Sequence, residues 1–467
     1  MPHLLISAAH KSSGKTTVSI GLCAALRQAG EIVQPFKKGP DYIDPLWLGE
    51  AAQRPCYNLD FYTMGHEEIL RNVSCYSQGS DISLIEANKG LYDGLDIDGS
   101  NSNAALAHLL QAPVVLVLST KGMTRGIAPL IIGYQAFDPK LNIAGVILNQ
   151  VGGTRHEAKL RAVIEHYTDV PVLGAVHKDP AMVIDERHLG LMPSNENQQA
   201  QHKIQQIADL VAAQVDLAQL KTLAAQATLP PAPVCPPPGG QHSKRVQIGI
   251  LRDEAFGFYY PGDLQALEKA GAELHFIDAL HDTRLPKIEG LFIGGGFPET
   301  QAAQLADNKI LRRAVRDAVE SGLPVYAECG GLMYLGRQLH WQGQAYPMTG
   351  ALALDTVMHE TPQGRGYIRL QETGLGLWGL NDKQGLPAQF SAHEFHYSQV
   401  IALDPKLTFA YKVLRGHGIN GKQDGIIYKN TLACYAHLRD VDNNPWTQRF
   451  VNFIQQIKEN SKEHTHV

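Results

Sequence analysis

Two short stretches of this sequence carry residue types that could do chemistry. The first is "AHKSSGKT" (residues 9–16), which follows an apolar run and precedes a helical pattern. A glycine-bearing loop at this place can wrap the free N–H groups of a helix N-terminus around a phosphate. Lys15 would then reach the β- and γ-phosphates of ATP, and Thr16 would give its hydroxyl to Mg²⁺. The other predicted ATP-binding residues are Gly14, Thr17 and Lys11.

This loop departs from the usual phosphate-loop pattern at one position. Ala9 stands where G-x-x-x-x-G-K-[ST] has its first glycine, so the sequence predicts a variant of the loop. Lys11 lies one position later than the additional lysine of partition-type ATPases, which argues against that role for it. The alternative is a chance Gly-Lys-Thr at the start of a helix. The strand and helix patterns that flank it disfavour this alternative.

Charged residues that could complete a nucleotide site follow in the same half of the chain. Glu86 ends the apolar run "ISLIEA", and a carboxylate at a strand end is the usual complement of nucleotide-bound Mg²⁺. The loops "KKGPDYIDP" (residues 37–45) and "KGLYDGLDIDG" (residues 89–99) could direct charges at phosphate, metal or a carboxylate substrate. For both loops, a solvated turn is the alternative.

The second stretch, "PVYAECGGLMYLG" (residues 324–336), places Cys329 between an apolar run and two glycines. A nucleophile on a tight strand-to-helix turn is exposed, and the helix N-terminus lowers a thiol's pKa toward the thiolate. The alternative is a buried structural cysteine, which the adjoining glycines disfavour. "GLFIGGGFPE" supplies another glycine turn whose N–H groups could stabilise an oxyanion. The predicted oxyanion-hole residues are Gly295, Gly296 and Gly330.

A thiolate that attacks an amide also needs a base that later protonates the leaving amine, and histidine is the usual residue. The chain has 20 histidines. His437 in "LACYAHL" follows a β-type run, while His393 and His396 lie in "SAHEFHYS". The pattern alone leaves all three open.

Strand and helix patterns alternate along the chain and predict the elements that must position these residues. Near-continuous apolar runs are typical of parallel strands covered on both faces. In the first half they occupy residues 3–7, 82–87, 113–120, 143–151 and 171–176, and in the second half residues 246–251, 272–278, 290–296 and 324–329. Amphipathic helical patterns lie between them. The fold class predicted is α/β, with two doubly wound domains.

A proline- and glycine-rich segment, "TLPPAPVCPPPGGQHSK" (residues 228–244), separates the two alternating regions. The predicted organisation has four parts. These are an ATP-dependent domain at 1–195, a helical segment and linker at 196–244, a second domain at 245–455, and a flexible tail at 456–467.

Composition excludes several classes of function. The 467 residues are 44% hydrophobic and 19% charged, and the formal net charge of -5 supplies no basic field for nucleic acid or anionic lipid. No leader or membrane-span pattern occurs, so a cytoplasmic protein is expected. The six cysteines show no paired spacing, which predicts reduced thiols. A homodimer is compatible with these features.

Both halves of the chain resemble the cobyrinic acid a,c-diamide synthase family over about residues 4–452. The segments that carry the resemblance are "KKGPDYID", "GLYDG", "VIEHYTDVPVLG", "ERHLGL", "FYYPGDLQALEKAGAEL", "GGGFPE", "ECGGLMYL" and "HEFHYS". The resemblance implies an N-terminal P-loop NTPase domain similar to dethiobiotin synthetase. It also implies a C-terminal, flavodoxin-like class I glutamine amidotransferase domain.

The resemblance implies a glutamine-hydrolysing, ATP-dependent amidoligase. With Mg²⁺, ATP would phosphorylate a side-chain carboxylate of a tetrapyrrole-derived macrocycle, and glutamine would supply the ammonia. Cys329 is then the nucleophile and His437 its base. Metal ligands would be Thr16, Glu86 and Asp41. Substrate-binding residues would be Asp44, Tyr42, Asp93, Lys89 and Arg125. Because Leu438-Arg439-Asp440 replaces the proline and glutamate of ordinary class I enzymes, the third member of the cysteine site stays open.

Two departures from the family bear on the substrate. Asn88 and Lys89 replace an apolar pair, and "STKGMTRGIAP" (residues 119–129) replaces a stretch rich in small residues. The first expectation is cobyrinate, converted to its a,c-diamide in cobalamin biosynthesis, and the alternative is sirohaem or sirohydrochlorin. A partition-type ATPase switch is an alternative of another class, and it leaves Cys329 unexplained.

Overall fold

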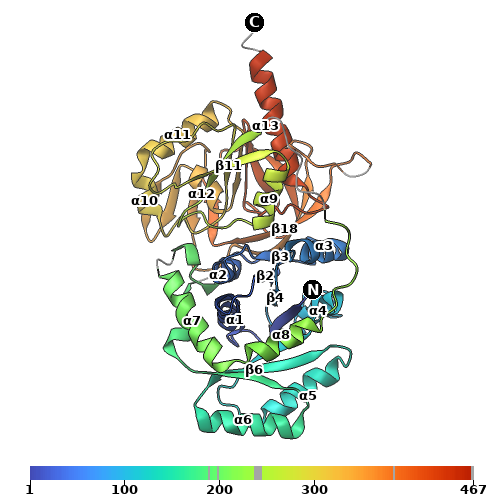
Figure 1. Cartoon of the computed structure of the whole chain (residues 1–467). Helices are drawn as coiled ribbons and strands as arrows, with labels where there is room; N and C mark the ends of the chain where they lie inside the picture. The colour runs from blue at the N-terminus through green and yellow to red at the C-terminus, as the bar shows by residue number, and fades with distance from the viewer. Residues whose placement is uncertain (188–189, 197–198, 236–244, 382–383, 464–467) are drawn as a thin grey trace. The chain divides into compact units, whose positions relative to one another are not determined.

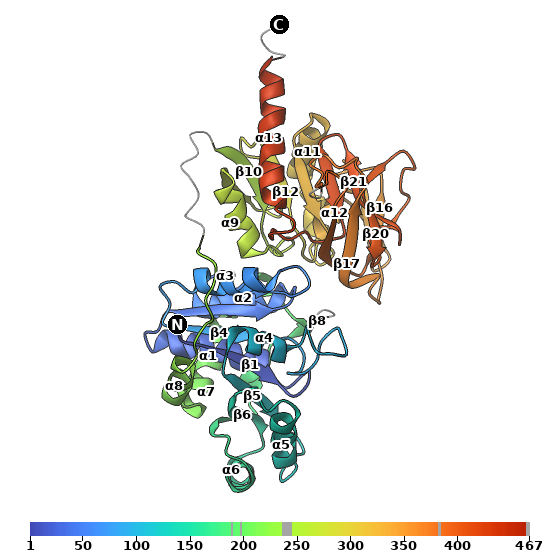
Figure 2. The same ribbon diagram turned by 90° about the vertical axis from the view of Figure 1, so that its right-hand side faces the viewer.

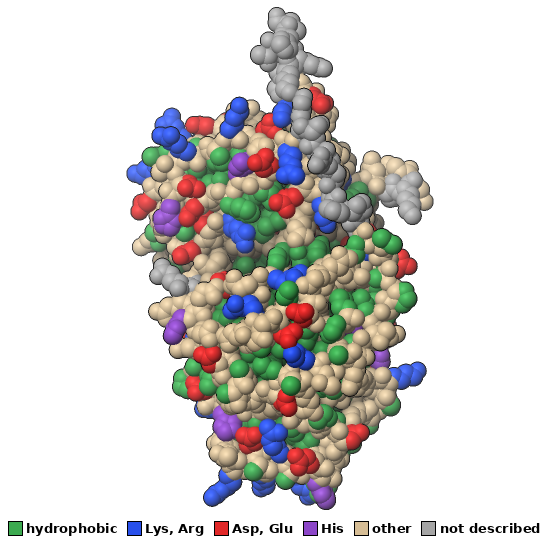
Figure 3. Space-filling model, viewed as in Figure 1, with side chains coloured by type: hydrophobic (Ala, Val, Ile, Leu, Met, Phe, Trp, Pro, Cys, Tyr) green, Lys and Arg blue, Asp and Glu red, His purple; other side chains and the backbone are tan. Residues whose placement is uncertain are grey.

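The computed structural model describes residues 1–467 except 188–189, 197–198, 236–244, 382–383 and 464–467. The chain divides into two compact units, Met1–Cys235 and Pro236–Val467 (Figure 1). On the face shown in Figure 3, acidic and basic side chains are interspersed. No helix among the described residues combines the length and the apolar character needed to cross a bilayer.

The first unit is built on a seven-stranded sheet with the order β3-β2-β4-β1-β5-β6-β7. Every pair of neighbouring strands in this sheet is parallel. The strands are β1 (His3–Ala8), β2 (Val33–Lys38), β3 (Tyr57–Leu59), β4 (Ile82–Glu86), β5 (Val114–Ser119), β6 (Ile143–Val151) and β7 (Val172–His177). A two-stranded ribbon, β8 (Glu186–Arg187) with β9 (Gly190–Leu191), follows. The five strands predicted for this half are confirmed, and β2 and β3 are additional.

Helices pack on this parallel sheet, as its apolar strands require. They are α1 (Lys15–Gln28), α2 (Ile43–Ala52), α3 (His66–Tyr76), α4 (Asn103–Leu110), α5 (Ile127–Phe137), α6 (Thr154–Tyr167), α7 (Ala200–Gln214) and α8 (Leu217–Ala225), with short 3₁₀ turns η1 (Pro180–Met182) and η2 (Ser194–Glu196). Figure 1 shows α7 beside α1, and a Cβ on Gly21 of α1 would meet Val211 Cγ2 of α7 at 2.4 Å. The helical part of the predicted linker therefore belongs to the first unit.

The second unit contains a nine-stranded sheet with the order β11-β10-β12-β13-β22-β21-β20-β17-β18. Its first five strands are parallel, and the remaining strands pair antiparallel. The strands are β10 (Val246–Leu251), β11 (Ala272–Ile277), β12 (Gly290–Ile293), β13 (Val325–Glu328), β17 (Gly364–Glu372), β18 (Gln389–His396), β20 (Thr408–Arg415), β21 (Gln423–Tyr428) and β22 (Thr431–Cys434). A four-stranded sheet holds β14 (Gln338–Trp341), β15 (Gln344–Pro347), β16 (Asp355–Met358) and β19 (Ser398–Ile401). The alternation predicted for this half covers only the parallel strands.

Two apolar cores lie on opposite faces of the larger sheet. One contains residues of α10 (Ala302–Asp307), α11 (Lys309–Glu320) and α12 (Gly330–Leu335). The other contains residues of α9 (Pro261–Lys269) and α13 (Trp446–Glu463). Figure 2 shows α9 and α13 on one side of β12 and α11 and α12 on the other. The segment predicted as a flexible tail is helical in α13 as far as Glu463, and residues 464–467 lie outside the described residues.

The prediction that all six cysteines are reduced is wrong for two of them. Cys75 on α3 and Cys235, which ends the first unit, form a disulfide with a Cα–Cα distance of 5.5 Å. The two cysteines are 160 residues apart in the sequence, so local cysteine spacing could not predict that they lie close together. The free cysteines Cys23, Cys56, Cys329 and Cys434 are all buried.

Candidate active sites

The predicted phosphate loop connects β1 to α1 in the first unit. Gly14 caps the helix with a left-handed backbone (φ 79°), and no side chain caps the first turn of α1. A Cβ at Gly14 would lie 2.1 Å from Nδ2 of Asn149, which donates to the Ser13 carbonyl at 2.8 Å. The position therefore requires glycine. Ala9, which replaces the usual first glycine, does not have a positive φ, so alanine causes no backbone strain at that position. The positive φ of a non-glycine residue in this loop is at Ser12 (62°).

The start of α1 meets a cluster of buried charges. Thr16 Oγ1 donates to Glu86 Oε1 at 2.6 Å and to Asp44 Oδ2 at 3.2 Å. Lys15 Nζ lies 3.1 Å from the same Glu86 oxygen. Lys37 Nζ donates to Glu86 Oε1 at 3.0 Å and to Asp44 Oδ2. The structure thus brings together four residues predicted for ATP, metal and substrate, and it adds Lys37 to them.

Electrostatics favour the charged forms of Lys37 and Asp44. Burial acts to lower the pKa of Lys37, but the carboxylates of Asp44, Glu86 and Asp41 raise it well above its ordinary value. Burial acts in the opposite direction on Asp44, where Lys37 and Lys15 hold the pKa below its usual range. Because Lys37 and Asp44 are paired with opposite charges, both side chains can stay ionised although the cluster is shielded from water.

The donor set of the cluster fits a nucleotide-bound Mg²⁺ ion. Glu86 Oε2 is buried and has no hydrogen-bond partner, so it presents an unused carboxylate oxygen beside the Thr16 hydroxyl. Asp41 adjoins the cluster: its Oδ2 is 3.7 Å from Lys37 Nζ, and its Oδ1 accepts from the N–H groups of Ile43 and Asp44 at the start of α2. Within the part of the chain that the structure describes, no group of three or more His, Cys, Asp or Glu side chains is placed to hold a metal by itself. Phosphate oxygens would have to complete the coordination.

A second lysine of the same strand was not among the predicted site residues. Lys38 is 1% exposed and donates to the Asn101 carbonyl at 2.7 Å. Burial lowers its pKa to about 8, and nearby Lys89 acts in the same direction against Asp60. Asn58 on β3 donates to the carbonyls of residues 39 and 41, which fixes the loop after this lysine. The sequence signal for both lysines, Lys37 and Lys38, was the charged loop "KKGPDYIDP" (residues 37–45) that they begin.

The other residues predicted for this half are spread around the cluster. Tyr42 is buried at the N-terminus of α2. Asp93 Oδ2 accepts from the Gly90 N–H at 3.0 Å. Arg125 does not join the charged cluster, because its Nη2 donates to the Tyr167 hydroxyl at 2.9 Å beside a hollow of about 430 Å³ next to α5. The remaining predicted side chains are Thr17, half-buried, and Lys11 and Lys89, both exposed.

In the second unit, Cys329 stands on a tight turn between β13 and α12. Its backbone has a positive φ (φ 48°, ψ -98°), which is rare for a non-glycine residue, and its N–H donates to the Cys434 carbonyl at 2.7 Å. The two glycines after it allow close approach, since a Cβ on Gly331 would lie 2.3 Å from the Ile293 carbonyl oxygen. Strain of this kind in a non-glycine residue is typical of functional turns.

The expectation that the helix N-terminus lowers the thiol pKa is wrong for this structure. Cys329 is only 7% exposed, and burial raises the pKa of its thiol. The carboxyl groups of Glu299 and Glu328 act in the same direction, against the N–H of Gly330. A six-residue helix does not outweigh these effects. The thiol therefore needs a base to take its proton.

His437 is the histidine that the structure brings to the glycine turns. A Cβ on Gly295 would lie 2.6 Å from His437 Cε1, and one on Gly330 would lie 3.2 Å from the Gly296 N–H nitrogen. The three predicted oxyanion-hole glycines thus lie close together, with the base candidate next to Gly295. Burial, with a contribution from His396, lowers the pKa of His437 to about 3, so its imidazole is neutral.

The other two candidate histidines lie on β18. The His393 ring centre is 6.1 Å from that of His437, and burial lowers its pKa to about 3. His396 stacks on Tyr435 with ring centres 3.7 Å apart, and its Nδ1 donates to the Ser398 carbonyl at 2.8 Å. His393 and His437 also pair through their backbones. His393 therefore lies beside His437, while His396 packs on Tyr435 with its Nε2 3.7 Å from Glu394 Oε2.

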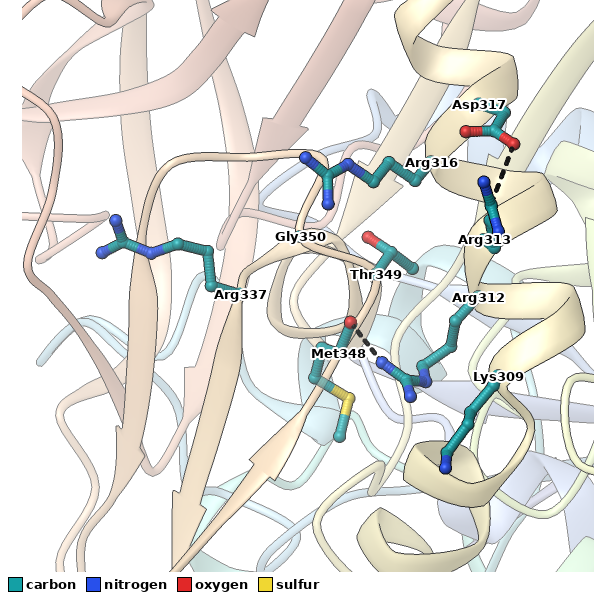
Figure 4. Close-up of a pocket in the computed structure, with 9 residues that line it drawn as sticks. All are labelled: Lys309, Arg312, Arg313, Arg316, Asp317, Arg337, Met348, Thr349 and Gly350. Atoms are coloured by element: carbon teal, nitrogen blue, oxygen red, sulfur yellow. Dashed lines mark hydrogen bonds and ion pairs between the residues drawn. The ribbon is translucent and has the colours of Figure 1, made fainter.

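Another hollow of the second unit does not include the cysteine turn. Figure 4 shows it between α11 and the loop at Met348, with a volume of about 680 Å³. Its lining residues are Lys309, Arg312, Arg313, Arg316, Asp317, Arg337, Met348, Thr349 and Gly350. None of them was predicted as a site residue.

Each unit matches a known domain family. Residues 5–191 match the CobQ/CobB/MinD/ParA nucleotide binding domain, and residues 247–445 match the CobB/CobQ-like glutamine amidotransferase domain. Together with the phosphate loop and the cysteine turn, these matches define the chain as an ATP-dependent, glutamine-hydrolysing amidoligase. Three relatives identify the family more closely. The cobyrinate a,c-diamide synthase of Magnetococcus marinus is 43% identical over 461 residues and covers 98% of both chains.

The other two relatives carry the same name. The enzyme of Methanosarcina acetivorans is 41% identical and covers 94% of this chain and 93% of its own. That of Archaeoglobus fulgidus is 38% identical and covers 98% of both. This chain belongs to the cobyrinate a,c-diamide synthase family. None of the three is named for sirohaem or sirohydrochlorin, so the alternative substrate has no support among them.

Proposed function

We propose that this protein converts cobyrinate to cobyrinate a,c-diamide in cobalamin biosynthesis, with ATP as energy source and glutamine as nitrogen donor. The observation that supports it best is the similarity over nearly the whole length to relatives of that name, with both domain families matched in order. A carboxylate is a poor electrophile, and glutamine holds its amide nitrogen firmly. The two sites solve these two problems separately.

The first site would activate the carboxylate. Lys15 would leave Glu86 and pair with the β- and γ-phosphates of ATP, while the loop N–H groups around Gly14 bind phosphate oxygens. Mg²⁺, held by Thr16 and Glu86 with Asp41 nearby, would neutralise phosphate charge. The substrate carboxylate oxygen attacks the γ-phosphorus, and ADP leaves. The product is an acyl phosphate whose phosphate is displaced by ammonia.

The second site would release that ammonia. His437 takes the proton of the Cys329 thiol, and the sulfur attacks the side-chain amide carbon of glutamine. The N–H groups around Gly295, Gly296 and Gly330 would stabilise the oxyanion. The imidazolium returns its proton to the leaving nitrogen, which departs as ammonia and leaves a thioester. Water then hydrolyses the thioester to glutamate and restores the thiol.

Two further parts of the proposal concern the place of reaction and the oligomeric state. The substrates named are small soluble molecules of biosynthesis, which favours the cytoplasm as the place of reaction. A homodimer remains a prediction, and sedimentation of the purified chain would test it.

The test is a substrate comparison with the purified protein. It is incubated with ATP, Mg²⁺ and glutamine against cobyrinate, hydrogenobyrinate, sirohydrochlorin and sirohaem in separate reactions, and the products are weighed by mass spectrometry. Two amidations of cobyrinate are expected. Diamidation of sirohaem with cobyrinate unchanged would refute the substrate assignment. Cys329→Ser should abolish glutamine-dependent amidation and retain the reaction with added ammonia.

A further inference from the structure

The usual third member of a cysteine amidotransferase site is missing from its usual place in this chain. Arg439 stands two residues after His437, and its guanidinium lies over the Tyr260 ring at 4.7 Å. The next residue, Asp440, is also engaged elsewhere. Its Oδ2 accepts from Thr447 N at 3.0 Å and from Thr447 Oγ1 at 2.6 Å, at the first turn of α13. An acid that orients the imidazole must come from another element.

Glu328, the last residue of β13, lies against the imidazole. It is 2% exposed, and its Oε2 is 3.3 Å from Nδ1 of His437. Its other oxygen, Oε1, accepts from the Leu438 N–H at 2.7 Å and from the Tyr326 hydroxyl. One oxygen thus fixes the carboxyl group, and the other faces the ring nitrogen that an orienting acid would bind.

Strand register explains why this residue reaches the histidine. β13 and β22 are parallel neighbours, with Glu328 paired to Cys434. The chain continues from Cys434 to His437 at the same edge of the sheet. At the next residue, Cys329, the chain turns from β13 into α12 with a positive φ. Glu328 can therefore contact the histidine while the neighbouring Cys329 carries the thiol.

We propose that Glu328 is the positioning residue of the glutaminase site: its Oε2 accepts the Nδ1 proton of His437, so that the unprotonated ring nitrogen is Nε2, which can take the thiol proton of Cys329. The inference rests on the proposed glutaminase role of the second unit. It is independent of which macrocycle the first unit amidates. Asp440 is assigned to the start of α13 instead.

The groups around the pair make its proton content depend on pH. Burial raises the pKa of Glu328 to about 8, while the hydrogen bonds from Tyr326 and Leu438 act to lower it. On the side of β18, His393, His396 and Glu394 face His437. A protonated Glu328 would donate to Nδ1 and place the remaining ring proton on Nε2, which is the wrong tautomer for a base. Loss of one proton from the pair gives the active arrangement, so activity should rise with pH through about 8.

The experiment compares four full-length proteins: wild type, Glu328→Gln, Tyr326→Phe and Asp440→Asn. Glutamate release is measured from pH 6 to 10, with ammonia-dependent amidation as the control for folding. The Glu328→Gln variant should show a kcat for glutamate release about 10²-fold lower than the wild type, with an unchanged KM for glutamine. Its activity should not rise near pH 8.

The other two variants separate positioning from structural support. Tyr326→Phe removes one hydrogen bond that lowers the Glu328 pKa, so the rise in activity should move to higher pH while the plateau is kept. Asp440→Asn should leave the profile in place. The rate at which iodoacetamide alkylates Cys329 should follow the same pH dependence in each protein, which gives a readout independent of turnover.

The outcomes are distinct. If Glu328→Gln keeps the wild-type kcat and pH profile, or if Asp440→Asn alone loses them, the inference is overturned. If the wild type releases no glutamate with every substrate supplied, the proposed function itself fails. Ammonia-dependent amidation that is lost together with glutaminase activity in Glu328→Gln would mean general unfolding. In that case Tyr326→Phe, through its pH shift alone, decides.

Discussion

The substitution Gly14→Ala tests the geometry of the phosphate loop. The structure gives two separate reasons why it should lower the free energy of unfolding. Alanine in the left-handed region costs about 1–2 kcal/mol. The new Cβ, 2.1 Å from Asn149 Nδ2, would also force that amide away from the Ser13 carbonyl. Loss of this buried hydrogen bond costs about 1–3 kcal/mol. The free energy of unfolding of the first unit should therefore fall by about 2–5 kcal/mol.

Gly30→Ala is the matched control. Gly30 is also left-handed (φ 93°), but nothing lies within 4 Å of its Cβ position. This variant should cost only the backbone part, about 1–2 kcal/mol. The difference between the two variants isolates the contact with Asn149.

A double variant sharpens the test. Asn149→Ala by itself loses the hydrogen bond to Ser13, at about 1–3 kcal/mol. If Gly14→Ala destabilises partly by breaking the same bond, the double variant should cost about 1–3 kcal/mol less than the sum of the single variants. Urea unfolding gives the stabilities, and calorimetry gives ATP affinity, which should fall about 10²-fold in Gly14→Ala and stay unchanged in Gly30→Ala. Equal costs for the two glycine variants, or strict additivity, would refute the reasoning.

Three further predictions concern buried charge, pH and the disulfide. Lys37→Met removes the buried cation that contacts both Asp44 and Glu86, leaving only Lys15 to compensate them, and should lower the free energy of unfolding of the first unit by about 3–5 kcal/mol in urea; a loss under about 1 kcal/mol would contradict the ion cluster. Burial lowers the pKa of His393 and His437 from 6.5 to about 3, so the folded state binds fewer protons and the second unit should lose stability as pH falls from about 6.5 toward 3. His393→Gln should lessen that slope by up to about 1.4 kcal/mol per pH unit, and an unchanged slope would argue that this histidine is already charged. Reduction of the Cys75–Cys235 disulfide should cost the first unit about 2–5 kcal/mol, an effect that Cys75→Ser should abolish.

Much of the fold could be predicted because its signals are local. The apolar strands of both parallel regions and the helix after the phosphate loop depend on residues a few positions apart, and so does the cap that the structure shows at Ser102, before α4. Ser102 Oγ accepts from the Ala105 N–H at 3.0 Å, as a capping serine should. The same local signals placed Gly14, Cys329 and the glycine turns at the chemical sites.

Non-local pairing accounts for what the sequence did not reveal. The sequence predicted Lys37 and Lys38 in a loop, whereas the structure places both at the end of the buried strand β2, where distant carboxylates and carbonyls compensate them. The disulfide joins residues 160 positions apart. Glu328 stands next to the nucleophile in sequence, but its role depends on a residue 109 positions away. No local pattern distinguishes such a residue from an ordinary end of a strand.

Strand register determines which side chains meet at each of the two sites. In the first unit, Lys37 of β2 and Glu86 of β4 are direct register partners, just as Glu328 of β13 and Cys434 of β22 are in the second. Successive side chains of a strand point to opposite faces, so a slip of one residue would separate Lys37 from Glu86 and bury two unpaired charges. The charged pair therefore penalises the wrong register more strongly than apolar residues would. Charges that the chemistry needs at the strand ends also select the arrangement of strands that brings them together.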